Sequence, residues 1–144
     1  MKLYKSQVNT SFGKINLIFN KNGLLNVSFK SYPGKWINNH FPDSDIQISN
    51  ENIYLTQIKE YFCGVRRKFG FPVVFIGTNF QKDVWKFVYN IPFSKPMSYS
   101  ELAKEIHKKS AQRAVGHALR ENHLLLVVPC HRVIKSNGNL GGFS

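Results

Sequence analysis

Two adjacent residues late in the chain, Cys130 and His131, are of the types needed for nucleophilic chemistry. The reactive form of a cysteine is its thiolate, which cationic neighbours such as His131 and Arg132 favour. Successive residues of an extended chain point to opposite faces, so we expect His131 to act on Cys130 through a water molecule. A cysteine that is followed directly by a histidine is more often a buried structural cysteine beside a surface histidine.

A second group of residues indicates a binding surface on a helix over residues 111–120. Helical spacing places an apolar set on one face, comprising Ala111, Val115, Ala118 and Leu119. The opposite face is basic and has a glycine at its centre, and it comprises Arg113, Gly116, His117 and Arg120. The missing side chain of Gly116 would let the backbone approach a ligand closely. An ordinary solvated helix face has a similar composition.

The elements around these residues can be predicted from capping and apolar patterns. Thr78-Asn79-Phe80-Gln81 and Ser98-Tyr99-Ser100-Glu101 are capping boxes that each predict the start of a helix. Ser110 is the expected cap of the third helix, which ends near Asn122. Three short helices in a basic protein indicate a helix-turn-helix. The apolar run over residues 124–128 predicts a buried strand that leads into Pro129 and Cys130.

The first half of the chain has the pattern of a small sheet with one helix. Strands are predicted over residues 1–30, with apolar positions between residues 12 and 19, a hairpin at Asn22-Gly23 and a strand over residues 24–29, and a further strand is predicted over residues 71–76. Residues 31–50 have the composition of a loop, and residues 52–62 have helical spacing with Gly64 as the stop. The sequence therefore predicts an α/β (α+β) fold with a strand-and-helix domain over residues 1–77 and a second domain over residues 78–144.

The composition limits the class of protein and its partners. The 144 residues include 20 basic and 8 acidic ones, for a net charge of +12, which favours a polyanionic partner such as nucleic acid. No apolar run approaches the length of a membrane helix, and no signal-peptide core follows Met1, so we expect a cytoplasmic protein. The two cysteines, Cys63 and Cys130, are too few for a disulfide framework and lack the short paired spacings of a zinc site. A single disulfide between them stays open, but free thiols in a reducing cytosol are the favoured interpretation.

The order of short motifs along the chain resembles that of the O6-alkylguanine-DNA alkyltransferases, the methylated-DNA–protein-cysteine methyltransferases. The central match is Pro129-Cys130-His131-Arg132-Val133-Ile134, which is similar to the family's alkyl-acceptor motif. The other matches follow in the family's order, at residues 61–64, 77–81, 84–85, 98–103, 113–116, 122 and 138–144. The resemblance implies a ribonuclease-H-like first domain and a winged-helix-like second domain.

The resemblance also implies a role for each matching residue. Cys130 is the alkyl acceptor, His131 is its base through water, and Asn122 ties the third helix to the acceptor loop. The remaining residues bind DNA in the minor groove. Arg113 replaces the flipped nucleotide in the duplex, Tyr99 helps to rotate that nucleotide out, and the Val133 carbonyl and Ser144 hold the guanine, with Gly116 and Arg120 on the inserted helix face.

The implied reaction is a single transfer from O6-alkylguanine in double-stranded DNA to Cys130, after base flipping and without metal or organic cofactor, by a monomeric protein. Two alternatives stay open. The first is a non-catalytic lesion sensor on the same fold, against which Cys130 argues because such sensors carry Trp at that position. The second is a Cys/His hydrolase, which would turn over repeatedly.

Three features depart from the family pattern. Phe143 stands where the family usually has Tyr, and His123 stands where it usually has Pro. The family chain continues past the position of Ser144 into a helix whose Glu orients the histidine. Either the sequence is a piece of a longer chain, or His131 lacks this partner, in which case we expect slow alkyl transfer.

Overall fold

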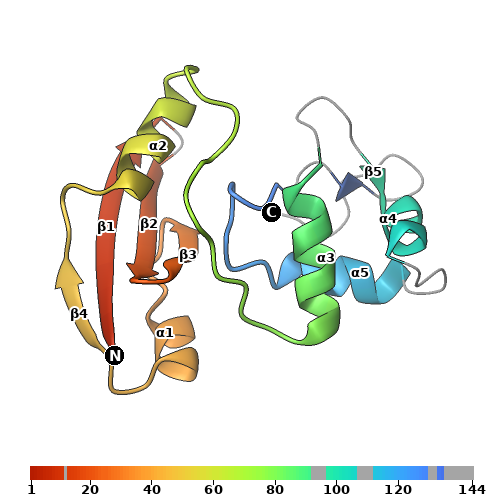
Figure 1. Cartoon of the computed structure of the whole chain (residues 1–144), viewed down its shortest axis with the longest axis horizontal. Coiled ribbons are helices and arrows are strands. Elements are labelled where there is room, and N and C mark those ends of the chain that lie inside the picture. The colour runs from red at the N-terminus through yellow and green to blue at the C-terminus, as the bar shows by residue number, and fades with distance from the viewer. Residues whose placement is uncertain (12, 92–96, 107–111, 130–132, 135–144) are drawn as a thin grey trace. The chain divides into compact units, whose positions relative to one another are not determined.

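The computed structural model describes residues 1–144 except 12, 92–96, 107–111, 130–132 and 135–144. The chain forms two compact units, Met1–Val74 and Phe75–Ser144, and Figure 1 shows their mixture of strands and helices. The division falls just before the boundary at Gly77 expected from the sequence. Among the helices described, none combines the length and the apolar character needed to cross a membrane.

The first unit contains a four-stranded sheet in the order β3-β2-β1-β4. Strands β1 (Lys2–Thr10), β2 (Gly13–Asn20) and β3 (Gly23–Phe29) are successive antiparallel neighbours, and β4 (Asp45–Ile48) pairs with β1 in parallel. The predicted hairpin is confirmed, because Asn20 pairs with Gly23. Gly23 has a φ of +146°, and a Cβ there would lie 2.8 Å from the Pro72 carbonyl oxygen, so the site requires glycine.

Helix α2 (Ile53–Phe62) packs against β1 and confirms the helix predicted after residue 52. The side chain of Asn52 accepts the N–H of Leu55 at 2.8 Å, which satisfies one free donor of the first turn. Ile58 of α2 is fully buried, and Gly64 follows the helix with a φ of +79°. The core of this unit consists mainly of Leu3, Ile15, Leu17, Ile18, Leu24, Leu25, Val27, Ile37, Leu55 and Ile58.

Two predictions for the first half were wrong. The segment expected to be a loop, residues 31–50, contains helix α1 (Gly34–His40) and strand β4. Burial of Ile37 gives α1 a tertiary anchor that its Asn-rich composition does not reveal. The strand expected over residues 71–76 is reduced to one bridge between Leu24 and Val73, because an apolar run reports burial more directly than conformation.

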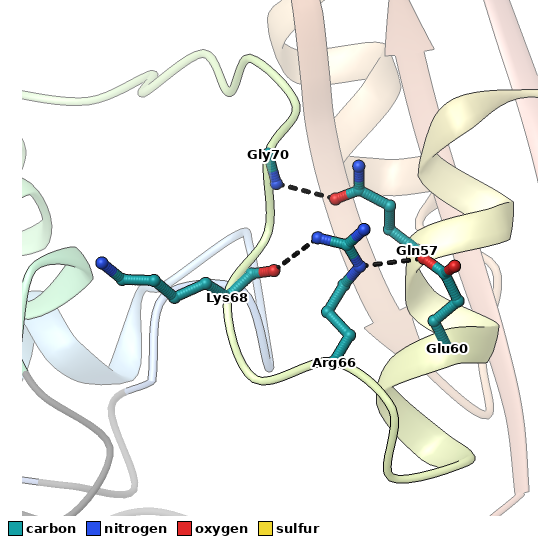
Figure 2. Close-up of polar contacts among 5 residues, drawn as sticks. All are labelled: Gln57, Glu60, Arg66, Lys68 and Gly70. Atoms are coloured by element: carbon teal, nitrogen blue, oxygen red, sulfur yellow. Dashed lines mark hydrogen bonds and ion pairs between the residues drawn. The ribbon is translucent and has the colours of Figure 1, made fainter.

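The loop that follows α2 is held to that helix by side chains, as Figure 2 shows. Arg66 Nε donates to Glu60 Oε1 at 2.9 Å, and Arg66 Nη1 donates to the Lys68 carbonyl at 2.8 Å. The Gln57 side-chain oxygen accepts the N–H of Gly70 at 2.7 Å. These contacts fix the path of the chain between α2 and the bridge at Val73.

In its described residues, the second unit consists mainly of three helices and one short strand pair. Helix α3 (Asn79–Tyr89) begins with the predicted capping box, because Thr78 Oγ1 accepts the Gln81 N–H at 3.1 Å while Gln81 Oε1 accepts the Thr78 N–H at 2.9 Å. Helix α3 packs against α5 (Gln112–Arg120), and α5 packs against α4 (Tyr99–Glu105), as Figure 1 illustrates. The described core includes Val84, Trp85, Val88, Leu102, Ala103, Val115, Ala118, Leu119, Leu124 and Val128.

Candidate functional site

Helices α4 and α5 provide the pair of packed helices that the capping patterns predicted. Ser98 Oγ accepts the N–H of Glu101 at 3.1 Å, which starts α4 at the predicted residue. Tyr99 is the first residue of α4, and its side chain lies outside the described part of the chain. Ser110, the expected cap of α5, lies in the undescribed segment 107–111.

Helix α5 has the two faces predicted from its sequence. Val115, Ala118 and Leu119 are at most 2% exposed and pack into the core. Arg113 and Arg120 are exposed, as is His117, while Gly116 is half-buried. The exposed face therefore presents basic side chains around a glycine, and such a face suits a polyanion.

Asn122 connects the end of α5 to the segment that leads toward Cys130. Its Nδ2 donates to the Val128 carbonyl at 3.0 Å, and its Oδ1 accepts the N–H of Leu124 at 2.9 Å. The Asn122 amide thus satisfies the Leu124 N–H at the start of the turn and the Val128 carbonyl at its end. Through these two bonds Asn122 fixes the backbone directly before Pro129.

Residues 125–127 form a turn, and Leu124 is only an isolated bridge residue, so the prediction of a buried strand over residues 124–128 was wrong. The N–H of Val128 donates to the Leu124 carbonyl at 2.8 Å, and Leu126 has a φ of +72°. Leu124, Val127 and Val128 are nevertheless buried. The apolar run was a correct signal of burial, but it could not distinguish an extended chain from a turn.

The other side of the acceptor motif is fixed by a short parallel strand pair. Strands β5 (Met97–Ser98) and β6 (Val133–Ile134) pair Met97 with Val133 and Ser98 with Ile134. This pairing brings the last two residues of the motif to the start of α4, where Tyr99 stands. The predicted site residues Cys130, His131 and Ser144 lie outside the described residues.

A buried cluster around His123 was not found by sequence reasoning, which noted this residue only as a departure from a family pattern. His123 Nε2 accepts the N–H of Ile76 at 3.0 Å, and its ring packs edge-on against Trp85 with the centroids 5.1 Å apart. The Trp85 indole N–H in turn donates to the Ala118 carbonyl at 2.8 Å. The position of His123 directly before the apolar run over residues 124–128 did not reveal these distant partners.

Comparison with known proteins gives consistent matches. A family profile described as "6-O-methylguanine DNA methyltransferase, DNA binding domain" matches residues 79–144. The chain is similar to the methylated-DNA–protein-cysteine methyltransferase of Methanosarcina acetivorans, with 35% identity over 99% of this chain and 90% of the relative. It is also similar to the inducible protein of that name from Bacillus subtilis, with 40% identity over 76% of this chain. That alignment covers 62% of the Bacillus protein, so the match spans less than two thirds of its length.

Solved structures are similar over both units. Mycobacterium tuberculosis OGT in complex with DNA has a TM-score of 0.84 and 28% identity, over 98% of this chain and 84% of that chain. An O6-methylguanine DNA methyltransferase from Methanococcus jannaschii has a TM-score of 0.64 and 27% identity, over 96% of this chain and 84% of that chain.

Proposed function

Because this chain belongs to the family of methylated-DNA–protein-cysteine methyltransferases, we propose that it repairs DNA by moving an alkyl group from O6 of guanine to Sγ of Cys130. The observation that carries the proposal is the 35% identity to the Methanosarcina acetivorans methyltransferase along 90% of that protein. The position of Cys130 in a Pro-Cys-His-Arg motif supports its choice over Cys63.

The proposed reaction is a displacement at the alkyl carbon. The Cys130 thiolate attacks that carbon, the carbon–oxygen bond to guanine breaks, and a carbon–sulfur bond forms. The electron pair of the broken bond stays with the guanine, which takes up a proton as it leaves. We assign the proton transfers to His131 acting through water. The thioether product has no easy reversal, so each molecule reacts once, and the chemistry requires neither metal nor organic cofactor.

Among the proposed site residues, Asn122 has the strongest structural support, and we propose that it ties α5 to the acceptor motif. Its hydrogen bonds to Leu124 and Val128 hold the turn that leads into the acceptor motif. On the other side of the motif we propose that the Val133 carbonyl binds the guanine edge together with Ser144, and that Tyr99 contacts the flipped nucleotide. The pairing of Met97 with Val133 supports this grouping, because it joins the end of the motif to the start of α4.

The proposed partner is double-stranded DNA that contains O6-alkylguanine. An alkyl group on O6 lies within the base stack, so the nucleotide must be extruded before Cys130 reaches it. We propose that α5 enters the minor groove, with Arg113 filling the vacated space, Gly116 allowing close approach and Arg120 contacting the backbone. Their exposure on one face supports this choice. We place the protein in the cytoplasm, whose reducing conditions keep a reactive thiol free. We also propose that it acts as a monomer, because one molecule repairs one lesion.

Intact-mass spectrometry after incubation with duplex DNA containing O6-methylguanine tests the function. The protein should gain one methyl group in place of a hydrogen, and peptide mapping should locate it on Cys130. Cys130→Ala should abolish the gain while leaving DNA affinity unchanged, and Cys63→Ala should behave as wild type. Binding without any mass gain would instead identify a non-catalytic lesion sensor, and label on Cys63 would refute the choice of acceptor.

A further inference from the structure

His123 is buried, with 5% of its surface exposed, and both its hydrogen bond and its ring contact are specific. Accepting the N–H of Ile76 at 3.0 Å requires that Nε2 carry no proton, so this nitrogen acts as an acceptor in the folded state. The ring plane stands at 84° to the indole of Trp85, an edge-to-face geometry that aromatic pairs prefer. The imidazole is therefore fixed both in position and in tautomer.

The residues on either side of His123, Asn122 and Leu124, form the start of the turn that leads toward Cys130. Asn122 directly before it bonds to the two ends of that turn, and Leu124 directly after it is fully buried. Ile76 belongs to the segment before α3, and Trp85 belongs to α3 itself. His123 thus connects the start of this turn to Ile76, in the segment before α3, and to Trp85 of α3.

We propose that His123 is a positioning residue for alkyl transfer. By accepting the Ile76 N–H it fixes the backbone next to Asn122, so that the amide of Asn122 meets Leu124 and Val128 and the turn that leads toward Cys130 keeps one conformation. A small displacement of a nucleophile lowers the reaction rate strongly. Buried neighbouring residues prevent such displacements by holding the nucleophile's backbone in place. This role rests on the proposed function, because it serves the same acceptor cysteine.

Three variants separate the hydrogen bond from the packing. His123→Phe keeps a ring against Trp85 but removes the acceptor. His123→Gln places an amide oxygen near the position of Nε2, so it retains the acceptor while losing the ring. His123→Asn is polar but too short to reach Ile76, and it provides a second loss variant should the Phe substitution fail to fold. His40→Gln, at an exposed histidine of the first unit, is the matched control.

The first measurement is the single-turnover transfer rate at saturating O6-methylguanine duplex, well below the unfolding temperature. We expect His123→Phe and His123→Asn to be slower by about tenfold, the equivalent of one lost hydrogen bond, with DNA affinity unchanged. His123→Gln should recover most of the rate, and His40→Gln should equal wild type. A residue needed only for stability would leave this rate unchanged, because the protein is folded under these conditions.

The second measurement is amide hydrogen exchange by NMR, which requires no activity. The loss variants should exchange faster at Ile76, Leu124 and Val128, while amides in β2 stay as in wild type. The role of His123 is overturned if the loss variants keep the wild-type rate, if His123→Gln is as slow as His123→Phe, or if Leu124 and Val128 exchange is unaltered. If wild type gains no methyl group, the proposed function fails, and the exchange data still decide whether His123 holds the turn.

Discussion

Gly77 lies so close to Trp85 that a Cβ on the glycine would be 2.8 Å from the indole ring carbons, and 2.5 Å from Gln81 Oε1. The absence of a side chain at residue 77 thus allows the indole and the capping glutamine to pack at the start of α3. This arrangement joins a local signal, the capping box, to the tertiary contact of Trp85 with Ala118.

Gly77→Ala should therefore destabilise the second unit. The added methyl group overlaps both the indole and the Gln81 side chain, so both must shift, and overpacking of this kind costs about 1–3 kcal/mol. Urea unfolding followed by tryptophan fluorescence measures the change. Gly70→Ala is the control, because a Cβ there would meet Gln57 at an ordinary 3.6 Å. Equal stability of the two variants would show that the Trp85 contact yields without cost.

Asn122 gives a prediction about rate. Asn122→Ala removes the bonds to both Leu124 and Val128, and we expect alkyl transfer to slow by more than about tenfold. Asn122→Asp keeps an acceptor for Leu124 but loses the donor to Val128, so its rate should also fall. Asn90→Ala serves as the control, since Asn90 donates to the Lys86 carbonyl at the exposed end of α3. A wild-type transfer rate in Asn122→Ala would contradict this account of the turn.

Arg113 gives a prediction about substrate form. If this exposed residue fills the space left by the flipped nucleotide, Arg113→Ala should slow the repair of duplex DNA far more than reaction with free O6-methylguanine base. Rates on the two substrates, measured side by side, test this. Lys104→Ala, which removes an exposed charge from α4, is the control for a general loss of positive charge. Equal slowing on duplex and free base would exclude the proposed role.

Tyr54 gives a prediction about alkaline pH. Burial raises the pKa of Tyr54 above its ordinary value of 10.0, because desolvation disfavours the phenolate. Folding therefore favours the neutral phenol. The resulting stability is complete below the unfolded pKa and is lost as pH rises through the folded pKa. Tyr54→Phe should lose less stability than wild type between about pH 9 and pH 11 in urea unfolding. Parallel losses in both proteins would exclude a contribution from Tyr54.

Features set by residues close in sequence were predictable. Thr78 bonds to Gln81 and Ser98 bonds to Glu101, so the starts of α3 and α4 depend only on neighbouring residues. The two faces of α5 follow from helical spacing, and burial of Val115 and exposure of Arg113 agree with it.

Features set by distant partners were not predictable. The partner of His123 is Ile76, 47 residues earlier, and no local pattern connects the two. The turn that follows Leu124 is held by the Asn122 side chain, which accepts the Leu124 N–H and donates to the Val128 carbonyl, and an apolar run does not reveal such side-chain bonds. The acceptor residues Cys130 and His131 were identified by type and motif, and their geometry lies outside the described residues.

The sheet of the first unit combines two kinds of pairing that should differ in how readily they open. Strands β1, β2 and β3 are consecutive, so their contacts close short loops, whereas β4 returns to β1 only after α1. Closing a longer loop costs more chain entropy, and β4 is a four-residue strand at the border of the sheet with Ile48 70% exposed. We therefore expect the meander to assemble first on folding and β4 to detach first on heating, while β2, buried on the inside of the sheet, keeps its amides protected until the whole unit unfolds.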